Sequence, residues 1–153
     1  QYNLSCVTGI LFNHESPFRQ KDFVTQKIIS EAILCSKNSN HKLNIGNIEI
    51  ARDWGWAEEY VEGMQLITRA KKVKDQILCT GKLTSLKQFI EITFKKLNLS
   101  WEKHTKIDKS LFRSKDIKVS VGNPIQMEID LNWKAKVGID LLIEKLIESK
   151  IKL

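Results

Sequence analysis

LSCVTGILF, residues 4–12, is the stretch that decides the fold class of this 153-residue chain. It is nearly continuous in aliphatic and β-branched residues, a pattern typical of a strand buried on both faces in a parallel sheet. The polar segment NHESP, residues 13–17, is expected to end this strand. Pro17 has no N–H to donate to a neighbouring strand, and it biases Ser16 away from the α region.

Helical and strand-like patterns alternate along the rest of the chain. Helices are predicted at residues 22–36, 53–71, from 84 onward and 138–151, and short strands at 43–46, 48–52, 76–80 and 118–121. Asp22 is the expected N-cap of the first helix, and Asp53 is expected to open the second. Ser85 and Gln88 match a capping box. Residues 100–109 are interpreted as a charged loop, and the turn at 122–124 as the entry to a short helix.

This alternation predicts an α/β chain with an at least partly parallel sheet. The length fits one domain with its own core. The content of 7 Gly and 2 Pro excludes collagen-like and low-complexity classes. The longest apolar runs are far shorter than the ~20 residues of a membrane-spanning helix. No signal peptide is visible, and a first residue of Gln rather than Met suggests a piece of a longer protein.

The net charge of +7 and the pI of about 9.3 predict an anionic partner: a phosphate, a nucleotide or a nucleic acid. Arg19, Lys27, Arg52 and Arg113 fall at the ends or starts of predicted elements, where guanidinium and ammonium groups could hold phosphate oxygens. No nucleic-acid motif is recognisable, but a basic nucleic-acid binder stays an alternative.

The three cysteines, Cys6, Cys35 and Cys79, are widely spaced and odd in number. They are interpreted as reduced, mostly buried thiols of a cytosolic protein.

No complete catalytic set is present in the sequence. His14, Glu15 and Ser16 have the residue types of a triad, but sequence neighbours cannot generally converge as a triad does, and no G-x-S-x-G elbow occurs. The isolated histidines and cysteines lack metal-site spacing. The glycines form neither G-x-G-x-x-G nor a P-loop, and neither tyrosine has a Lys four residues later.

Several segments together resemble one family. The resemblance is carried by GILFNHESP (9–17), FVTQKI (23–28), GN (46–47), ARDWG (51–55), YVE (60–62), TG (80–81) with Ser85 and Phe89, and LNWK (131–134). In order and spacing over nearly the whole chain they resemble the C-terminal part of the GDP-mannose 4,6-dehydratases, which are extended short-chain dehydrogenase/reductases.

The resemblance implies late strands of a Rossmann-type sheet plus a single substrate-binding portion over residues 1–153. The family's Gly-rich NADP loop, its catalytic Thr and Glu and its Tyr-x-x-x-Lys would all precede Gln1. The family converts GDP-mannose to GDP-4-keto-6-deoxymannose and water with tightly held NADP, which carries the hydride. The chain alone is therefore expected to be inactive. The expected partners are GDP-mannose and a dimer- or tetramer-forming second copy, with no nucleic acid and no membrane, in the cytoplasm.

The resemblance also assigns roles to single residues. His14 and Arg19 match NADP contacts, and Asn13 matches the asparagine that meets the phosphate or sugar. The other matches face GDP: Val24 lines the guanine pocket, Lys27 and Arg52 face the nucleotide, Arg113 meets phosphate and Asp116 meets ribose.

Four departures from the family pattern accompany these matches. The PRRG segment is PFRQ at residues 17–20, which puts tetramer assembly in question, and the usual His after DWG is Trp56. YRPTE has become FRSKD at residues 112–116, so the carboxylate of Asp116 would sit about 1.5 Å further from the ribose. The loop between residues 101 and 111 is also shorter. A non-catalytic nucleotide-sugar binding or assembly module is the alternative function.

Overall fold

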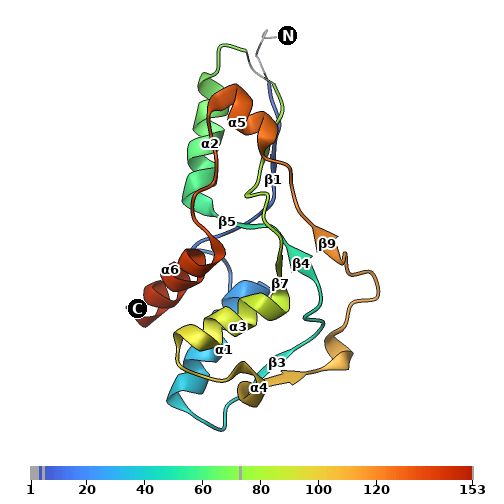
Figure 1. The fold of residues 1–153 in the computed structure, drawn as a ribbon, viewed down its shortest axis with the longest axis vertical. Coiled ribbons are helices and arrows are strands. Elements are labelled where there is room, and N and C mark those ends of the chain that lie inside the picture. The colour runs from blue at the N-terminus through green and yellow to red at the C-terminus, as the bar shows by residue number, and fades with distance from the viewer. Residues whose placement is uncertain (1–3, 5, 73, 153) are drawn as a thin grey trace.

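The computed structural model describes residue 4, residues 6–72 and residues 74–152 (Figure 1). The helices are α1 (Val24–Lys37), α2 (Ala57–Arg69), α3 (Leu86–Lys96), α4 (Trp101–His104), α5 (Ile125–Leu131) and α6 (Ile139–Ile151), with a 3-10 turn η1 (Lys109–Leu111). The strands are β1 (Gly9–Leu11), β2 (Asn13–Glu15), β3 (Leu43–Ile45), β4 (Ala51–Arg52), β5 (Trp54–Trp56), β6 (Gln76–Leu78), β7 (Thr84–Ser85), β8 (Thr105–Ile107) and β9 (Val119–Ser120).

The strands form small, mostly parallel sheets. β1 pairs with β6, β2 with β5 and β3 with β8, each in parallel, and β4 lies between antiparallel β7 and parallel β9. Such parallel pairs need long crossover connections, which the helices supply. The predicted α/β class with a partly parallel sheet is confirmed.

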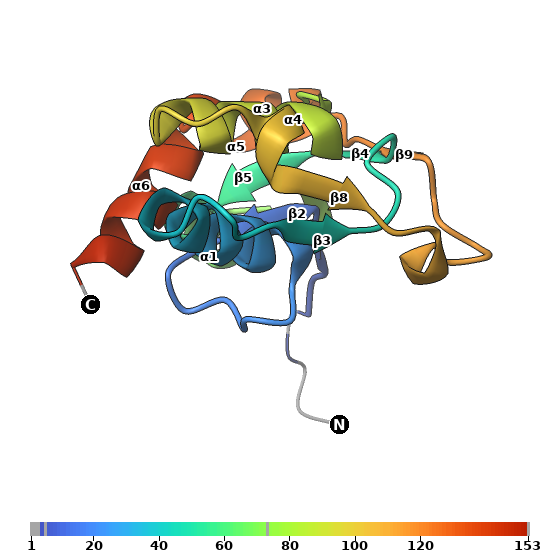
Figure 2. The ribbon, with the colours of Figure 1, turned by 90° about the horizontal axis from the view of Figure 1, so that it is seen from below.

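One core lies at the end of the molecule where α1, α3 and α6 pack together (Figure 1). Their apolar faces close around the indole rings of β5, and Trp54 meets Phe89 of α3 edge-on at 5.3 Å between ring centroids. Figure 2, seen from below, shows β3 and β8 side by side next to α1. This core holds β5 and the start of α1 in fixed positions.

A second core lies at the opposite end, where α2 and α5 pack against β1 and β6 (Figure 1). Its buried residues are Tyr60, Ile67, Leu78, Met127 and Trp133. The Trp133 indole donates to the backbone oxygen of Glu59 at 3.1 Å, and the Glu59 carboxylate accepts from the N–H groups of Lys136 and Val137. These bonds fix the connection from α5 to α6.

The predicted strand over residues 4–12 is wrong in its length and in its burial. Residue 5 lies outside the described residues; of the others in this range only Gly9–Leu11 form a strand, β1, in which Gly9 and Ile10 are exposed, Ile10 to 50%. Within the described residues β1 pairs with β6 alone, and α2 packs against it. The polar NHE segment, expected to break the strand, instead forms β2, because β5 supplies a parallel partner for it.

The predicted starts of the first two helices are also wrong. α1 begins after Phe23, with no side-chain cap, so Asp22 is not its N-cap. Asp53 does not open α2 but lies fully buried between β4 and β5, and α2 begins at Ala57. Residues 100–109, expected to be a loop, contain α4 and β8, because β3 offers a partner to β8. The strand predicted at 48–52 is shortened to Ala51–Arg52.

The remaining predicted elements are confirmed with small shifts. The Ser85–Gln88 capping box is present in full, and α5, α6, β3, β6 and β9 lie where the patterns placed them. The cysteines are unpaired, with Cys35 and Cys79 buried and Cys6 exposed. Burial raises the pKa of the Cys79 thiol to about 11.

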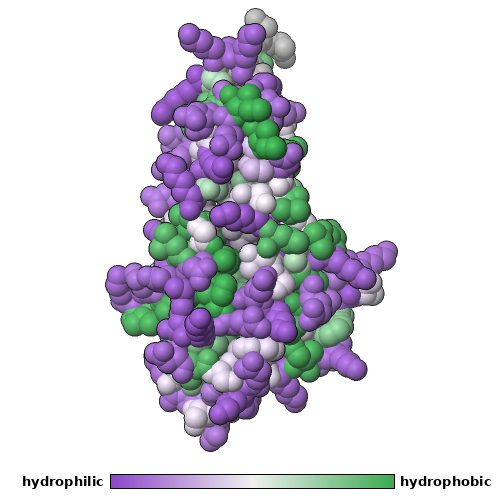
Figure 3. All heavy atoms as spheres, in the orientation of Figure 1, coloured by the Kyte–Doolittle hydropathy of each residue, from purple (hydrophilic) through white to green (hydrophobic). Residues whose placement is uncertain are grey.

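Much of the surface in Figure 3 is hydrophilic, and one of its apolar areas lies over α5. Ile125 and Ile129 of that helix are exposed. Within the described part of the chain, no helix combines the length and the apolar character needed to cross a bilayer.

Candidate functional site

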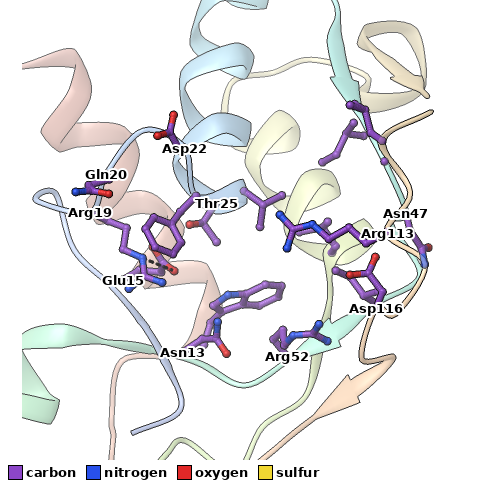
Figure 4. A pocket seen from close by; sticks show the side chains of 18 residues that line it. Asn13, Glu15, Arg19, Gln20, Asp22, Thr25, Asn47, Arg52, Arg113 and Asp116 are labelled. Carbon is purple, nitrogen blue, oxygen red and sulfur yellow. Dashed lines mark ion pairs between the residues drawn. The ribbon is translucent and has the colours of Figure 1, made fainter. Parts of the chain in front are cut away.

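A cavity of about 570 Å³ opens where β2, β4 and β5 meet the start of α1 (Figure 4). Its volume lies in the usual range of small-molecule sites, about 300–1,000 Å³. Its lining residues include Asn13, Glu15, Arg19, Val24, Thr25, Asn47, Arg52, Trp54, Leu86, Arg113 and Asp116. The lining residues span 103 positions of the sequence, from Asn13 to Asp116, so the fold brings distant segments to one site.

Arg52, Arg113, Asn47 and Asp116 form one end of the cavity, called here the arginine end (Figure 4). Arg52 lies on β4, and its Nη1 donates to the backbone oxygen of Ala51 at 2.8 Å. Arg113 comes from the segment after η1 and points toward the cavity in Figure 4. Two guanidinium groups from separate segments therefore converge on one space, which suits a group with several anionic oxygens.

Glu15, Arg19 and Thr25 form the opposite end, called here the carboxylate end (Figure 4). The Glu15 side chain is buried, and its Oε1 lies 3.9 Å from Nε of Arg19. The Arg19 guanidinium lies over the Phe23 ring, 3.7 Å from its centroid. Burial raises the pKa of the Glu15 carboxyl above its usual range, and the nearby Thr25, Arg19 and Gln26 side chains only partly oppose this shift.

Asn13 and Trp54 line the middle of the cavity. They are register partners in the parallel pair of β2 and β5, so the pairing itself sets them side by side. Val24 adds an apolar wall from the first turn of α1. That turn contains no acidic residue, so the positive end of the helix dipole faces this region without a neutralising carboxylate of its own.

The structure brings six of the eight predicted site residues to this cavity and leaves His14 and Lys27 outside its lining. His14 alternates with Asn13 and Glu15 along β2, so its side chain lies on the other side of the strand. Its Nδ1 lies 2.8 Å from the backbone oxygen of Phe12, and its ring lies 5.0 Å from that of Tyr60. Lys27 is half-buried in α1. The roles of all eight stay predictions.

Two residues that depart from the family pattern, Phe18 and Trp56, lie in different surroundings in the structure. Phe18 is 95% exposed in the loop before α1. Trp56 is buried in the first core, where its indole N–H donates to Glu58 at 3.3 Å and the Lys145 ammonium lies over its ring.

Sequence reasoning missed Glu15 and Trp54 as site residues. Glu15 lies two positions after Asn13, so it shares that residue's side of the strand once NHE is recognised as a strand. Trp54 could have been found only from the pairing of β2 with β5, which is a property of the fold.

Over the described ranges, no three His, Cys, Asp or Glu side chains gather to hold a metal ion. Of the two residues that match NADP contacts, Arg19 lines the cavity and His14 does not, so they are not gathered at one site.

Comparison with solved structures shows which fold the chain shares. The chain superposes on dTDP-glucose 4,6-dehydratase from Bacillus anthracis, solved in complex with NAD, with a TM-score of 0.85 at 12% identity, over 99% of this chain and 46% of that chain. It superposes on RMD from Pseudomonas aeruginosa, complexed with NADPH, with a TM-score of 0.82 at 15% identity, over 94% of this chain and 47% of that chain. The fold is thus that of part of a nucleotide-sugar dehydratase or epimerase.

The sequence comparisons then give the family. Residues 1–146 match the family model described as GDP-mannose 4,6 dehydratase, and the chain belongs to this family. It is 36% identical to GDP-mannose 4,6 dehydratase 1 of Arabidopsis thaliana and 31% identical to GDP-mannose 4,6 dehydratase of Homo sapiens, covering 42% and 45% of them. The chain thus spans less than half the length of the curated relatives it matches.

Proposed function

We propose that this chain is the GDP-sugar-binding part of a GDP-mannose 4,6-dehydratase, an enzyme that converts GDP-mannose to GDP-4-keto-6-deoxymannose and water. The observation that carries the proposal is the convergence of Arg52 and Arg113 with Asp116 at one end of a cavity of nucleotide-sugar size. A diphosphate offers several anionic oxygens, and two guanidinium forks match them. Asp116 beside them can accept hydrogen bonds from ribose hydroxyls.

The middle of the cavity suits the parts of the ligand that flank the diphosphate. Val24 and Trp54 offer apolar surface for a base or a sugar ring, and the Asn13 amide can both donate and accept. Lys27 lies outside the lining, so its proposed contact with GDP requires its flexible side chain to reach the rim.

The hydride step of the proposed reaction needs a nicotinamide cofactor, for which NADP is proposed on the family resemblance. His14 would supply a single contact to it, whereas Arg19, which the resemblance also matches to an NADP contact, lines the proposed nucleotide-sugar cavity. The described residues offer no proton-transfer tyrosine. Tyr60 is fully buried, and burial together with the nearby Asp53 carboxylate raises the pKa of its hydroxyl well above the usual range, the opposite of what a general base requires. Alone, the chain is proposed to bind but not to turn over.

Calorimetric titration of GDP-mannose into this chain at two salt concentrations tests the proposal, with UDP-glucose as the control ligand. Saturable binding of GDP-mannose in preference to UDP-glucose supports it. Binding to neither, or equal binding to both, contradicts it. A single-stranded oligonucleotide in a third titration addresses the basic-binder alternative, which predicts steep salt dependence without preference for GDP. Assembly into a dimer or tetramer in the cytoplasm belongs to the same proposal, and sedimentation measures the assembly.

A further inference from the structure

Unpartnered polar atoms concentrate at the carboxylate end of the cavity. In the described residues, seven buried side-chain nitrogen or oxygen atoms have no hydrogen-bond partner. Three of the seven belong to Glu15, Arg19 and Thr25, which line this end, and a fourth belongs to Gln26, which neighbours Thr25 but is outside the lining. Buried polar atoms are normally paired, because an unpaired one has lost its hydrogen bonds to water without replacement, so such a concentration is typical of a site that binds a ligand.

The unpaired atoms of Glu15 and Arg19 do not satisfy each other in their present positions. Glu15 Oε1 and Arg19 Nε are 3.9 Å apart, beyond hydrogen-bond distance. The amide nitrogen of Gln26 already donates to the backbone oxygen of Ser16 at 3.2 Å, which leaves its Oε1 free. Thr25 and Gln26 are buried to the same degree as Glu15, so bulk water does not reach them easily.

The chemistry of the three lining atoms selects the kind of group they would hold. Glu15 Oε2 accepts, Arg19 Nε donates and the Thr25 hydroxyl can do either. An anion would face the Glu15 carboxylate, and a cation would face the Arg19 guanidinium, so each is repelled by one member of the set. Neutral hydroxyl groups both donate and accept, and two of them on adjacent carbons can satisfy a carboxylate and an arginine together.

We propose that Glu15, with Arg19 and Thr25, forms a hydroxyl-recognition subsite for a vicinal diol of the bound nucleotide sugar. The inference rests on the proposed function and deepens it, since the arginine end would hold the diphosphate and the carboxylate end a sugar ring. Figure 4 shows Asn13 between the two ends, so a ligand could extend from one to the other past Asn13 and Trp54. With the ribose on Asp116, as proposed above, the diol is that of the hexose; the ribose diol carries the same chemistry and is the other source that the test distinguishes.

The experiment compares three ligands with three forms of the chain. The ligands are GDP, GDP-mannose and 2′,3′-dideoxy-GDP; the forms are wild type, Glu15→Gln and the matched control Glu62→Gln, which removes the same charge from an exposed position on α2. Hydrogen bonds to a charged group contribute about 1.5–3 kcal/mol, so Glu15→Gln is expected to weaken binding of the diol-bearing ligand about ten- to a hundred-fold. Glu62→Gln is expected to bind as wild type does.

Each pattern of results has a defined meaning. If Glu15→Gln abolishes the preference for GDP-mannose over GDP, the diol is that of the hexose; if it abolishes the preference for GDP over 2′,3′-dideoxy-GDP, the diol is that of the ribose. Wild-type affinities of Glu15→Gln for all three ligands would overturn the subsite and leave the proposed function intact. No binding of GDP or GDP-mannose to the wild-type chain would overturn the proposed function and this inference with it.

Thr25→Val provides a second variant, since it removes a hydroxyl without changing shape or charge. Circular dichroism establishes that each variant is folded before titration. If Glu15→Gln does not fold, Thr25→Val decides: a smaller loss of the same preference supports the subsite, and an unchanged preference overturns it.

Discussion

The Asp53 carboxylate accepts two hydrogen bonds from Thr80, one from the backbone N–H at 2.9 Å and one from the hydroxyl at 2.6 Å. Its second oxygen accepts from the N–H groups of Gly81 at 2.9 Å and Gly122 at 3.4 Å. Asp53 lies between β4 and β5, Thr80 after β6 and Gly122 after β9. One buried side chain therefore ties three connections together and fixes the strand end that carries Arg52.

Replacing this carboxylate should destabilise the chain strongly. Asp53→Asn turns an acceptor oxygen into an N–H₂ group that faces backbone N–H donors, which should lower the free energy of unfolding by about 2–4 kcal/mol. Thr80→Val removes one of the four bonds and should cost about 1 kcal/mol. Urea denaturation measures both, with Asp140→Asn as an exposed control expected to change stability by less than about 1 kcal/mol. A stability of Asp53→Asn within 0.5 kcal/mol of wild type, on the order of the error for a neutral surface change, would contradict this account.

Gly55 is required by a close approach inside the fold. A Cβ on Gly55 of β5 would lie 2.6 Å from the hydroxyl oxygen of Tyr60, whose ring is fully buried. Since the ring has no room to move, Gly55→Ala should destabilise by about 1–3 kcal/mol through overpacking. Gly138→Ala is the matched control, because a Cβ there has no atom within 4 Å and only the N-cap preference of α6 changes. Equal thermal unfolding midpoints for the two variants would show that the Tyr60 ring moves aside, which would contradict this prediction.

Burial of Glu15 gives the stability of the chain a particular pH dependence. Because burial raises the pKa of this carboxyl in the folded state above its ordinary value of 4.5, the folded state holds the proton more tightly than the unfolded state does. The carboxyl's contribution to stability is thus complete below pH 4.5 and is lost as the pH rises through the raised pKa.

Glu15→Gln lacks this titration and should gain stability relative to wild type as the pH rises from 4 to about 8. Each kcal/mol of gain should raise the melting midpoint by about 2–4 °C for a chain of this size. Melting curves of both forms at several pH values measure the effect. Midpoints that stay parallel over the whole range would show that the Glu15 carboxyl is not desolvated. A variant that is more stable but binds its ligand less well would identify Glu15 as a residue kept for function at the expense of stability.

Local patterns in the sequence predicted the local features of the fold. In the capping box, Gln88 Oε1 accepts from the Ser85 N–H at 2.9 Å and Ser85 Oγ accepts from the Gln88 N–H at 3.1 Å. Both partners lie three positions apart, so the sequence alone contains the information. The apolar stripe of α6 is equally local: of the five residues that the spacing predicts on one face, Leu142, Ile143, Leu146 and Ile147 are buried and Ile139 is half-buried.

Features that depend on distant partners were missed. The polar residues of β2 form a strand because β5 lies beside them, 41 positions further along from Asn13 to Trp54. Thr105–Ile107 form β8 because β3 is its partner. Asp53 has the residue type of a helix cap, but its four donors come from Thr80, Gly81 and Gly122, so tertiary bonds override the local preference. The family resemblance supplied candidate site residues one at a time, and only the fold shows which of them share a cavity.

The arginine end yields a last prediction, which separates specific phosphate recognition from general attraction to a basic surface. Arg113→Ala should lower the affinity for GDP about ten- to a hundred-fold, because a charge-assisted pair contributes about 1.5–3 kcal/mol. Arg113→Lys should recover only part of this loss, since an ammonium cannot form the two parallel bonds of a guanidinium. Arg69→Ala, at the end of α2 and outside the cavity, removes the same charge and should leave the affinity unchanged. Titration calorimetry with GDP measures all three, and equal losses for Arg113→Ala and Arg69→Ala would mean that net charge alone attracts the nucleotide.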